Sequence, residues 1–346
     1  ILGLMEARYF KHSLQFKRPS GTSRGILTTK DSWFLILTQD GKRGVGECSL
    51  LSGLSYDDTR DFEKQLAALC TALNEQVSLP DLQQWPALQM GYETALLDLA
   101  ADCPFELFPS AFTSGSDSIP INGLVWMGSF DYMSQQIKTL LEKGFDCIKL
   151  KIGAIHIEEE LKLLAQIRKE FNASEVIIRV DANGAFSPAK ALEQLKRLSD
   201  YELHSIEQPL AVNQWEALSD LCEKSPLPIA LDEELIGRFT EEECLTLLQT
   251  IQPAYIILKP SLLGGFQASE QWIKWAESQE IGWWVTSALE SNVGLNAIAQ
   301  WTYNQKYSGH QGLGTGSLFT NNIDSPLVIK KGCLWIDNLI PWSEID

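Results

Sequence analysis

The stretch Cys147-Ile-Lys-Leu-Lys-Ile152 places two lysines, Lys149 and Lys151, in an apolar setting that favours a strand. Alternate side chains of a strand point to the same face, so the two ammonium groups lie side by side. Such a pair among apolar neighbours is costly unless anionic groups face it. The rest of the chain is therefore expected to supply carboxylates opposite this strand.

Acidic residues and a third lysine close the apolar, β-prone runs that come next in the chain. They occur in Val180-Asp-Ala-Asn183, Ile206-Glu-Gln-Pro209, Leu231-Asp-Glu233 and Ile257-Leu-Lys-Pro260. The ends of successive runs are about 25 to 30 residues apart, and amphipathic helical patterns separate them. This regular spacing predicts repeated strand–helix units.

From about residue 120 the alternation predicts a parallel α/β sheet, and eight units over roughly 200 residues favour a TIM-type barrel. A doubly wound sheet is the alternative, but no Gly-x-Gly-x-x-Gly motif follows the first run and no P-loop is present. The candidate strands are 121–126, 147–151, 176–181, 204–207, 229–232, 255–259, 283–287 and, as the weakest, 311–314.

The first 117 residues lack the strand–helix alternation. Their strand patterns come first and their helical patterns follow, which predicts an α+β capping domain. A β-meander ends in a hairpin turned at 39–42, and two helical patterns cover 57–76 and 86–101. Two polar or small-residue stretches, 17–25 and 49–55, are expected to be mobile flap loops.

The predicted division is therefore a capping domain at 1–117 and a barrel at 118–317. The tail, 318–346, returns to short β-like runs and is expected to pack back on the capping domain.

Composition excludes several function classes. The net charge is −17 and no basic stripe is interleaved with aromatics, so no nucleic-acid partner is expected. The seven scattered cysteines, without Cys-x-x-Cys, indicate free thiols in a reducing compartment. No apolar run of 18 residues and no signal-peptide pattern is present. We expect a soluble cytoplasmic protein without a membrane partner; the pattern carries no signal for oligomeric state.

Five charged residues each close one of five successive candidate strands: Lys151, Asp181, Glu207, Asp232 and Lys259. A single strand-end Asp is more often a helix cap or turn residue, and a single lysine is usually solvated. Five consecutive placements, with lysines on both sides of three carboxylates, instead favour a functional set. In a barrel, this is the end at which catalytic groups lie.

Three carboxylates converging within about 4–5 Å repel by about 4 kcal/mol per pair at an effective dielectric near 20. They therefore need a cation between them. Oxygen ligation favours Mg²⁺, or Mn²⁺, over zinc, because no Cys or His at a strand end completes a softer set.

A divalent cation flanked by lysines suits proton abstraction next to a substrate carboxylate. The metal and ammonium charges stabilise the enediolate that results. A lysine acts as a base near neutrality only if neighbouring cations and burial lower its pKa. We expect Lys149 to tune this pKa and Lys151 to transfer protons, on a small anionic substrate.

Lys-x-Lys, Asp-Ala-Asn, Glu-Gln-Pro, Asp-Glu and Lys-Pro on five successive strands resemble the muconate-lactonising subgroup of the enolase superfamily. A lysine base with Mg²⁺ is known for that superfamily. The resemblance implies a modified (β/α)7β barrel with an α+β capping domain. It implies metal ligation by Asp181, Glu207 and Asp232, lysines 151 and 259 on opposite sides of the substrate, and a supporting Lys149.

Within the subgroup, the stretches 18–25, 53–58, 122–128, 259–265, 287–292 and 312–319 look most similar to the o-succinylbenzoate synthase family. This resemblance implies dehydration of 2-succinyl-6-hydroxy-2,4-cyclohexadiene-1-carboxylate to o-succinylbenzoate, a step of menaquinone biosynthesis. Lys151 would take the α-proton and then assist departure of hydroxide. Lys259 would act as a charge over the planar intermediate.

Further substrate contacts are expected around this set. Arg179 shares the strand face of Asp181, and either neighbours the substrate carboxylate or pairs with a ligand. Gly264 and Gly265 form either an anion nest for the succinyl carboxylate or only a tight turn. The remaining candidates are Ser287, Ser261, Asn122, Arg24 with its neighbour Ser23 on the first flap, and Trp126 beside the ring.

The main alternative is another reaction on the same site, such as N-acylamino acid racemisation, dipeptide epimerisation or cycloisomerisation. Dipeptide epimerases carry an Asp-x-Asp near the last barrel strand, whereas this region reads Gly312-Leu-Gly-Thr-Gly316. A barrel that binds metal without catalysis is a further alternative, but the full charged set is present.

Overall fold

The computed structural model describes residues 3–22 and 25–345. Its amino-terminal part is an antiparallel sheet in the order β1 (Glu6–Thr22), β2 (Gly25–Gln39) and β3 (Lys42–Ser49). At the β2–β3 turn, Asp40 and Gly41 both have positive φ, at 51° and 78°. Two such residues in succession are typical of tight hairpin turns, so this part of the predicted meander is confirmed.

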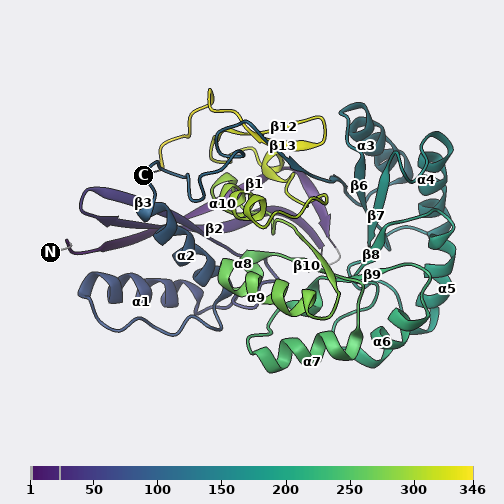
Figure 1. Cartoon of the computed structure of the whole chain (residues 1–346), viewed down its shortest axis with the longest axis horizontal. Helices are drawn as coiled ribbons and strands as arrows, with labels where there is room; N and C mark the ends of the chain where they lie inside the picture. Colours follow the sequence, from purple (N-terminus) through teal and green to yellow (C-terminus); the bar gives the residue numbers. More distant parts are fainter. Residues whose placement is uncertain (1–2, 23–24, 346) are drawn as a thin grey trace.

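Two helices, α1 (Phe62–Glu75) and α2 (Pro86–Ala100), pack on this sheet (Figure 1). Alternate β2 residues Trp33, Leu35 and Leu37 belong to the same hydrophobic cluster as these helices. Residues between them, such as Phe34, pack instead with Val293 of the barrel. The sheet is therefore buried on both faces, which explains the continuous apolar run of β2.

The loop predicted at 17–25 is wrong for residues 17–22, which belong to a strand. Residues 17–22 continue β1 and Gly25 begins β2, with a register shift between Gln15 and Ser20. Residues 20–22 pair with residues 25–27 of β2 despite the polar sequence. Ser23 and Arg24 lie outside the described residues. The second expected flap does leave the sheet, since the amides of Leu54 and Ser55 turn back onto the Leu51 carbonyl oxygen.

Seven strands of the described chain form a parallel sheet in the order β11-β10-β9-β8-β7-β6-β5. The predicted barrel strands are confirmed, with boundaries within about two residues. Their bounds are β5 (Gly123–Val125), β6 (Cys147–Lys151), β7 (Ile177–Asp181), β8 (Ser205–Glu207), β9 (Ile229–Leu231), β10 (Tyr255–Leu258) and β11 (Gly282–Val285).

Helices separate these strands and cover the outside of the sheet (Figure 1). Local sequence sets their ends, as in α7, where Thr240 and Glu243 form a capping box. The helices are α3 (Phe130–Glu142), α4 (Ile157–Glu170), α5 (Pro188–Ser199), α6 (Trp215–Lys224), α7 (Glu241–Ile251), α8 (Pro260–Leu263), α9 (Gly265–Glu277) and α10 (Asn292–Asn304).

The weakest candidate strand closes the barrel. Gly312 forms a parallel bridge to Thr286 after β11, and Gln311 forms one to Ile121 before β5. The Gly312 amide donates to the Val285 carbonyl oxygen at 2.8 Å, and the Asn122 amide to that of Gln311 at 2.9 Å. The architecture is thus the predicted (β/α)7β barrel.

The tail contacts two places in the fold. The hairpin of β12 (Leu327–Lys330) and β13 (Cys333–Ile336) pairs with β4 (Ile119–Pro120), directly before the barrel. Closer to the barrel end, Phe319 bridges Phe16 of β1. No helix in residues 3–22 and 25–345 is long and apolar enough to cross a membrane.

Candidate active site

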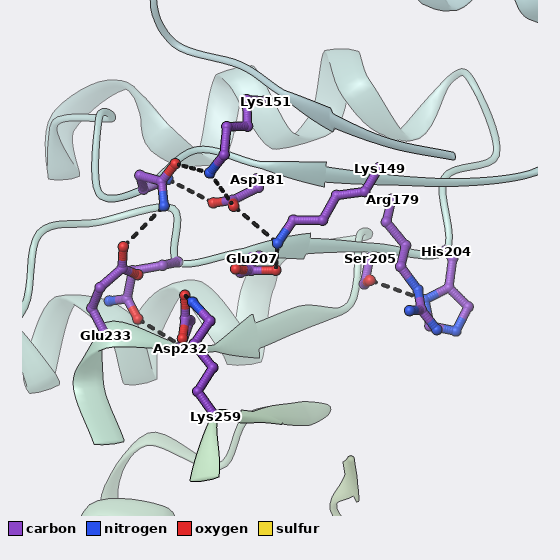
Figure 2. A network of polar contacts seen from close by, with 12 residues as sticks. Lys149, Lys151, Arg179, Asp181, His204, Ser205, Glu207, Asp232, Glu233 and Lys259 are labelled. Atoms are coloured by element: carbon purple, nitrogen blue, oxygen red, sulfur yellow. Dashed lines mark hydrogen bonds and ion pairs between the residues drawn. The ribbon is translucent and has the colours of Figure 1, made fainter. Parts of the chain in front are cut away.

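Neighbouring strands bring the predicted charged residues together inside the barrel (Figure 2). Lys151, Asp181 and Glu207 are register partners on β6, β7 and β8. Asp232 directly follows β9, and Lys259 directly follows β10. Because parallel strands end at the same edge of the sheet, their last residues converge there.

The lysines are paired with the carboxylates. The Lys149 ammonium lies 2.5 Å from Glu207 Oε2 and 3.0 Å from Asp181 Oδ2. Lys151 also approaches Asp181 Oδ2, at 3.0 Å, and Lys259 forms an ion pair with Asp232. Each lysine is thus held by at least one carboxylate of the set.

Burial and neighbouring charge shift several pKa values here. Burial raises the pKa of Glu207, the Asp181 charge raises it further, and Lys149 only partly opposes them. Burial also acts to raise the pKa of Asp181, but Lys149 and Lys151 bring it below its usual range. The pKa values of the two carboxylates therefore shift in opposite directions. Asp181 forms ion pairs with both Lys149 and Lys151, whereas Glu207 forms one with Lys149 and is also repelled by the charges of Asp181 and Asp232.

Neighbouring carboxylates raise the pKa of the supporting lysine, Lys149. Burial lowers the pKa of Lys149, but Asp181 and Glu207 outweigh it and raise the value above normal. Asp232 and Glu207 likewise raise the pKa of Lys259 against its burial. The protein's own charges thus keep both ammonium groups protonated.

Two polar residues extend the set beyond the residues assigned from sequence. Asn183 Oδ1 accepts from the Lys151 ammonium at 2.8 Å, and its Nδ2 donates to Glu233 Oε1 at 2.9 Å. Both residues stand in the quoted motifs, Asp-Ala-Asn and Asp-Glu. These two motifs were therefore the sequence pattern from which the contacts could have been predicted. The contacts orient Lys151.

Gln208 explains the middle of the Glu-Gln-Pro motif. Its side-chain Oε1 accepts from the backbone amides of Asp232 and Glu234, at 3.2 and 3.3 Å. Its own φ is 38°, which turns the chain directly after Glu207. The residue therefore fixes the backbone that carries Asp232, a role that sequence reasoning missed.

Among the described residues, no group of three or more His, Cys, Asp or Glu side chains is arranged to hold a metal ion. The reason is visible in Figure 2, where carboxylate oxygens are turned toward lysines. However, Glu207 Oε1 and Glu233 Oε2 are buried without a hydrogen-bond partner in that part of the chain. Buried, unpaired carboxylate oxygens suit a hard cation such as Mg²⁺, so the donor set fits the predicted metal.

A cavity of about 760 Å³ opens over the charged set, within the usual size of small-molecule sites. Its charged wall includes Lys151, Asp181 and Lys259. The remaining wall is largely apolar and comes from both the sheet of the amino-terminal part and the barrel. It includes Leu27, Leu51, Leu54, Trp126, Leu289 and Leu318.

Two predicted substrate contacts line this cavity. Ser287 is buried and its Oγ is 2.6 Å from Thr315 Oγ1. Asn122 is also buried, and its Oδ1 has no hydrogen-bond partner among the described residues. Trp126 lines the cavity as well. The position of Arg24 lies outside the described residues.

Arg179 and Ser261, two other candidates, do not line the cavity. The guanidinium of Arg179 lies 4.0 Å from the centre of the Trp284 ring and donates to the His310 carbonyl oxygen at 2.9 Å. Figure 2 shows it beside His204, away from Asp232 and Lys259. The Ser261 hydroxyl is fully buried and donates to Glu290 at 2.6 Å.

The amides directly after Gly264 and Gly265 bind a carboxylate of the protein, while the Gly264 amide donates to the Pro260 carbonyl oxygen. Glu93 of α2 accepts from the amide of Phe266 at 2.7 Å and from that of Gln267 at 3.2 Å. Gly264 and Gly265, with φ of 101° and 92°, shape this turn and do not line the cavity. These amides therefore connect α2 to the barrel and do not receive a substrate carboxylate.

Comparison with known proteins identifies the family. The model of the family Enolase C-terminal domain-like matches residues 132–339. An o-succinylbenzoate synthase of Desulfotalea psychrophila is 47% identical, over 96% of this chain and 99% of the relative. The crystal structure of MenC from Desulfotalea psychrophila superposes with a TM-score of 0.87, at 44% identity, covering 96% of this chain and 100% of that one.

A more distant relative has a different activity in its name. The D-Ala-D/L-Ala epimerase of Cytophaga hutchinsonii is 26% identical, over 94% of this chain and 88% of the relative. Its similarity is far lower than the 47% above, although both alignments span most of the chain. The chain therefore belongs to the o-succinylbenzoate synthase family of the enolase superfamily.

Proposed function

We propose that the protein dehydrates 2-succinyl-6-hydroxy-2,4-cyclohexadiene-1-carboxylate to o-succinylbenzoate, the step of menaquinone biosynthesis implied by its family. The observation that carries the proposal is a cavity lined by Lys151, Asp181 and Lys259. Asp181 is the register partner of Lys151 on the neighbouring strand. The 47% identity to an o-succinylbenzoate synthase supports the same reaction.

Lys151 is the general base. Its Nζ, when neutral, takes the proton from the carbon next to the substrate carboxylate, and the C–H electron pair is delocalised onto that carboxylate. This electron pair then forms the new ring double bond when the C–O bond breaks. The same Nζ returns the proton to the departing hydroxyl, so water leaves and the ring becomes aromatic. Asn183 and Asp181 hold this nitrogen, at 2.8 and 3.0 Å.

Lys259 stays protonated and stabilises the negative charge that develops on the substrate. Its raised pKa, caused by Asp232 and Glu207 against the effect of burial, favours this role over proton transfer. Lys149 compensates the charges of Asp181 and Glu207 below the substrate.

Asp181, Glu207 and Asp232 would hold Mg²⁺, or Mn²⁺, and the cation would add positive charge where the substrate carboxylate binds. The unpaired Glu207 Oε1 supports this assignment. Ser287 and Asn122 are the proposed neutral contacts to the substrate, because both are polar groups in a mainly apolar wall.

We also propose the division into a capping domain at 1–117 and a barrel at 118–317, with the tail at 318–346 returning to the capping domain. The Phe16–Phe319 bridge supports the return of the tail. The free cysteines support a reducing compartment, which we take to be the cytoplasm.

Racemisation of N-acylamino acids is the second candidate, because lysines on two sides of one site would permit proton transfer to either face. Epimerisation of dipeptides has less support. Gly312, Gly314, Thr315 and Gly316 line the cavity at the last strand, so that wall offers no carboxylate for a substrate ammonium group.

The test is the absorbance change when purified protein and Mg²⁺ are mixed with the cyclohexadiene substrate. Metal-dependent aromatisation that is lost in Lys151→Ala and with EDTA supports the proposal. Protein that is inert with this substrate, but exchanges α-protons of N-succinyl amino acids in D₂O, supports the second candidate. Inactivity in both assays with bound metal would refute the lysine mechanism.

A further inference from the structure

A buried group of charged and hydroxyl side chains connects the amino-terminal sheet to the barrel behind the cavity. Its sheet members are Lys30 and Glu47, and its barrel member is Glu290; each is at most 4% exposed. Four serines complete the group and are fully buried: Ser32, Ser49, Ser261 and Ser291. None of these residues has a role in the proposed reaction.

Glu47 crosses from the sheet to the barrel. Its carboxylate accepts from the amide and the hydroxyl of Ser291, at 2.9 and 2.5 Å, and from the Gly294 amide at 2.9 Å. On its own sheet it accepts from the Ser32 hydroxyl at 2.7 Å. Four hydrogen bonds therefore fix this carboxylate at the amino-terminal end of α10.

Glu290 holds two barrel segments that end at the cavity. It accepts from the Ser261 hydroxyl at 2.6 Å and from the Ala288 amide at 2.8 Å. Ser261 lies two residues after Lys259, and Ala288 directly follows Ser287. The Glu290 carboxylate therefore sets the distance between the segment that carries Lys259 and the segment that carries Ser287.

Lys30 is the buried cation of this group, and the charges of Glu47 and Glu290 act on it without a direct ion pair. Burial lowers the pKa of Lys30, and the charges of Glu47, Glu290 and Asp31 oppose that effect only in part. Its ammonium donates to the Ser49 hydroxyl. Leu27, three residues before Lys30, and Leu51, two residues after Ser49, both line the cavity.

We propose that Lys30 is a positioning residue. Its buried ammonium fixes the position of Leu27 and Leu51, which line the cavity, relative to Lys259 on the opposite, barrel side. Without it, two buried carboxylates would lack their countercharge, and the segments that Glu290 holds would loosen. The kinetic part of this inference rests on the proposed function; the part on chain mobility does not.

Lys30→Met tests the proposal, because it keeps most of the side-chain stem and removes the charge. Lys11→Met is the matched control: Lys11 lies on the adjacent strand of the same sheet, in an exposed ion pair with Asp31 at 2.7 Å. Exposed pairs of this kind contribute little to stability. Both variants are first checked for cooperative unfolding.

The primary readout is hydrogen exchange of the full-length protein, followed by mass spectrometry. In Lys30→Met we expect at least fivefold faster exchange in peptides covering 259–265 and 286–291, far from the substitution in sequence. Lys11→Met should exchange like the wild type there. Wild-type exchange of these barrel peptides in folded Lys30→Met would overturn the proposal.

The second readout is steady-state turnover. We expect kcat/KM to fall at least tenfold in Lys30→Met and to return to within threefold of the wild type in Lys30→Arg. Unchanged kcat/KM in Lys30→Met, with active wild type, would count against the proposal. A wild type that is itself inactive would instead refute the proposed function, and the exchange result would then decide on Lys30.

If Lys30→Met does not fold, Ser49→Ala replaces it. This variant removes the hydroxyl that accepts from the Lys30 ammonium and leaves every charge in place. Exchange in 259–265 should rise at least twofold. Exchange equal to that of the wild type would overturn the positioning role.

Discussion

Glu93 and Phe266 are 173 residues apart in sequence, yet the Glu93 carboxylate accepts the Phe266 amide proton at 2.7 Å. The contact places a negative charge at the amino-terminal end of α9, where the helix dipole stabilises it. It also explains the second glycine of the Gly264-Gly265 pair. A Cβ atom on Gly265 would lie 2.0 Å from Glu93 Oε2.

Gly265→Ala should therefore destabilise the protein. The substitution forces a left-handed φ of 92° on alanine and displaces Glu93. We expect a loss of about 1–3 kcal/mol in the free energy of unfolding, measured by urea denaturation. Gly41→Ala is the control for φ alone, because nothing lies within 4 Å of its Cβ position. Equal losses in the two variants would show that the Glu93 contact is unimportant.

Asn183→Ala should lower kcat more than it raises KM. The variant removes the oxygen that accepts from Lys151 and leaves Glu233 without its amide partner. Loss of such a supporting contact typically costs about 10- to 100-fold in activity. Steady-state kinetics checks this, with the exposed Asn172→Ala as control. A normal kcat in Asn183→Ala would show that Lys151 needs no such support.

Mg²⁺ should stabilise the folded protein against heat. A ligand present at about 100 times its Kd adds about 2.7 kcal/mol when it binds only the folded state. We expect Mg²⁺ to raise the Tm of the wild type and of the surface variant Glu216→Gln, and EDTA to reverse the rise. In Glu207→Gln the rise should be absent, because a neutral amide replaces the carboxylate that carries the unpaired oxygen. A full Mg²⁺ response in Glu207→Gln would exclude Glu207 as a ligand.

Asp57 predicts a pH dependence of stability. Burial raises its pKa to about 7, although the Ala87 amide donates to Oδ2 at 2.8 Å. A raised acid pKa means that the folded state holds a proton that the unfolded state has lost. Stability is therefore present below the unfolded pKa near 4 and falls as pH rises toward 7.

Asp57→Asn should remove this dependence. Between pH 5 and 8, the wild type should lose about 2 kcal/mol more than the variant in the free energy of unfolding. Urea denaturation at both pH values measures the difference. Parallel losses in the two proteins would mean that another group causes the pH dependence.

The barrel could be predicted because its strands are short apolar runs with evenly spaced charged ends. Parallel register then converts a repeat in sequence into a ring in space, as for Lys151, Asp181 and Glu207. The same reasoning was wrong for Arg179. Strand alternation predicts which face of the sheet a side chain is on, but not how far along the barrel axis it lies. Arg179 comes two residues before Asp181 on β7, and its guanidinium contacts Trp284 instead of the cavity.

Contacts between distant segments account for the other differences. The glycine pair was assigned to a substrate carboxylate, but the amides that bind an anion are those of Phe266 and Gln267, and no local pattern shows that Glu93, on α2, is that anion. Likewise, the polar stretch 17–22 carries loop-like residues, and only its pairing partner makes it a strand. Gln208 was overlooked because its partners, the amides of Asp232 and Glu234, become neighbours only after two strands pair.

The return of the tail to the first strand also sets an order of events during synthesis. Ser13 and Gln15 of β1 pair with Asn321, and Leu318 and Leu334 complete the cavity wall. A ribosome adds about 5–20 residues per second, so β1 waits many seconds for this partner. The cavity therefore forms only after almost the whole chain has left the ribosome, and a nascent chain that stops before residue 318 has no complete pocket in which to bind a substrate.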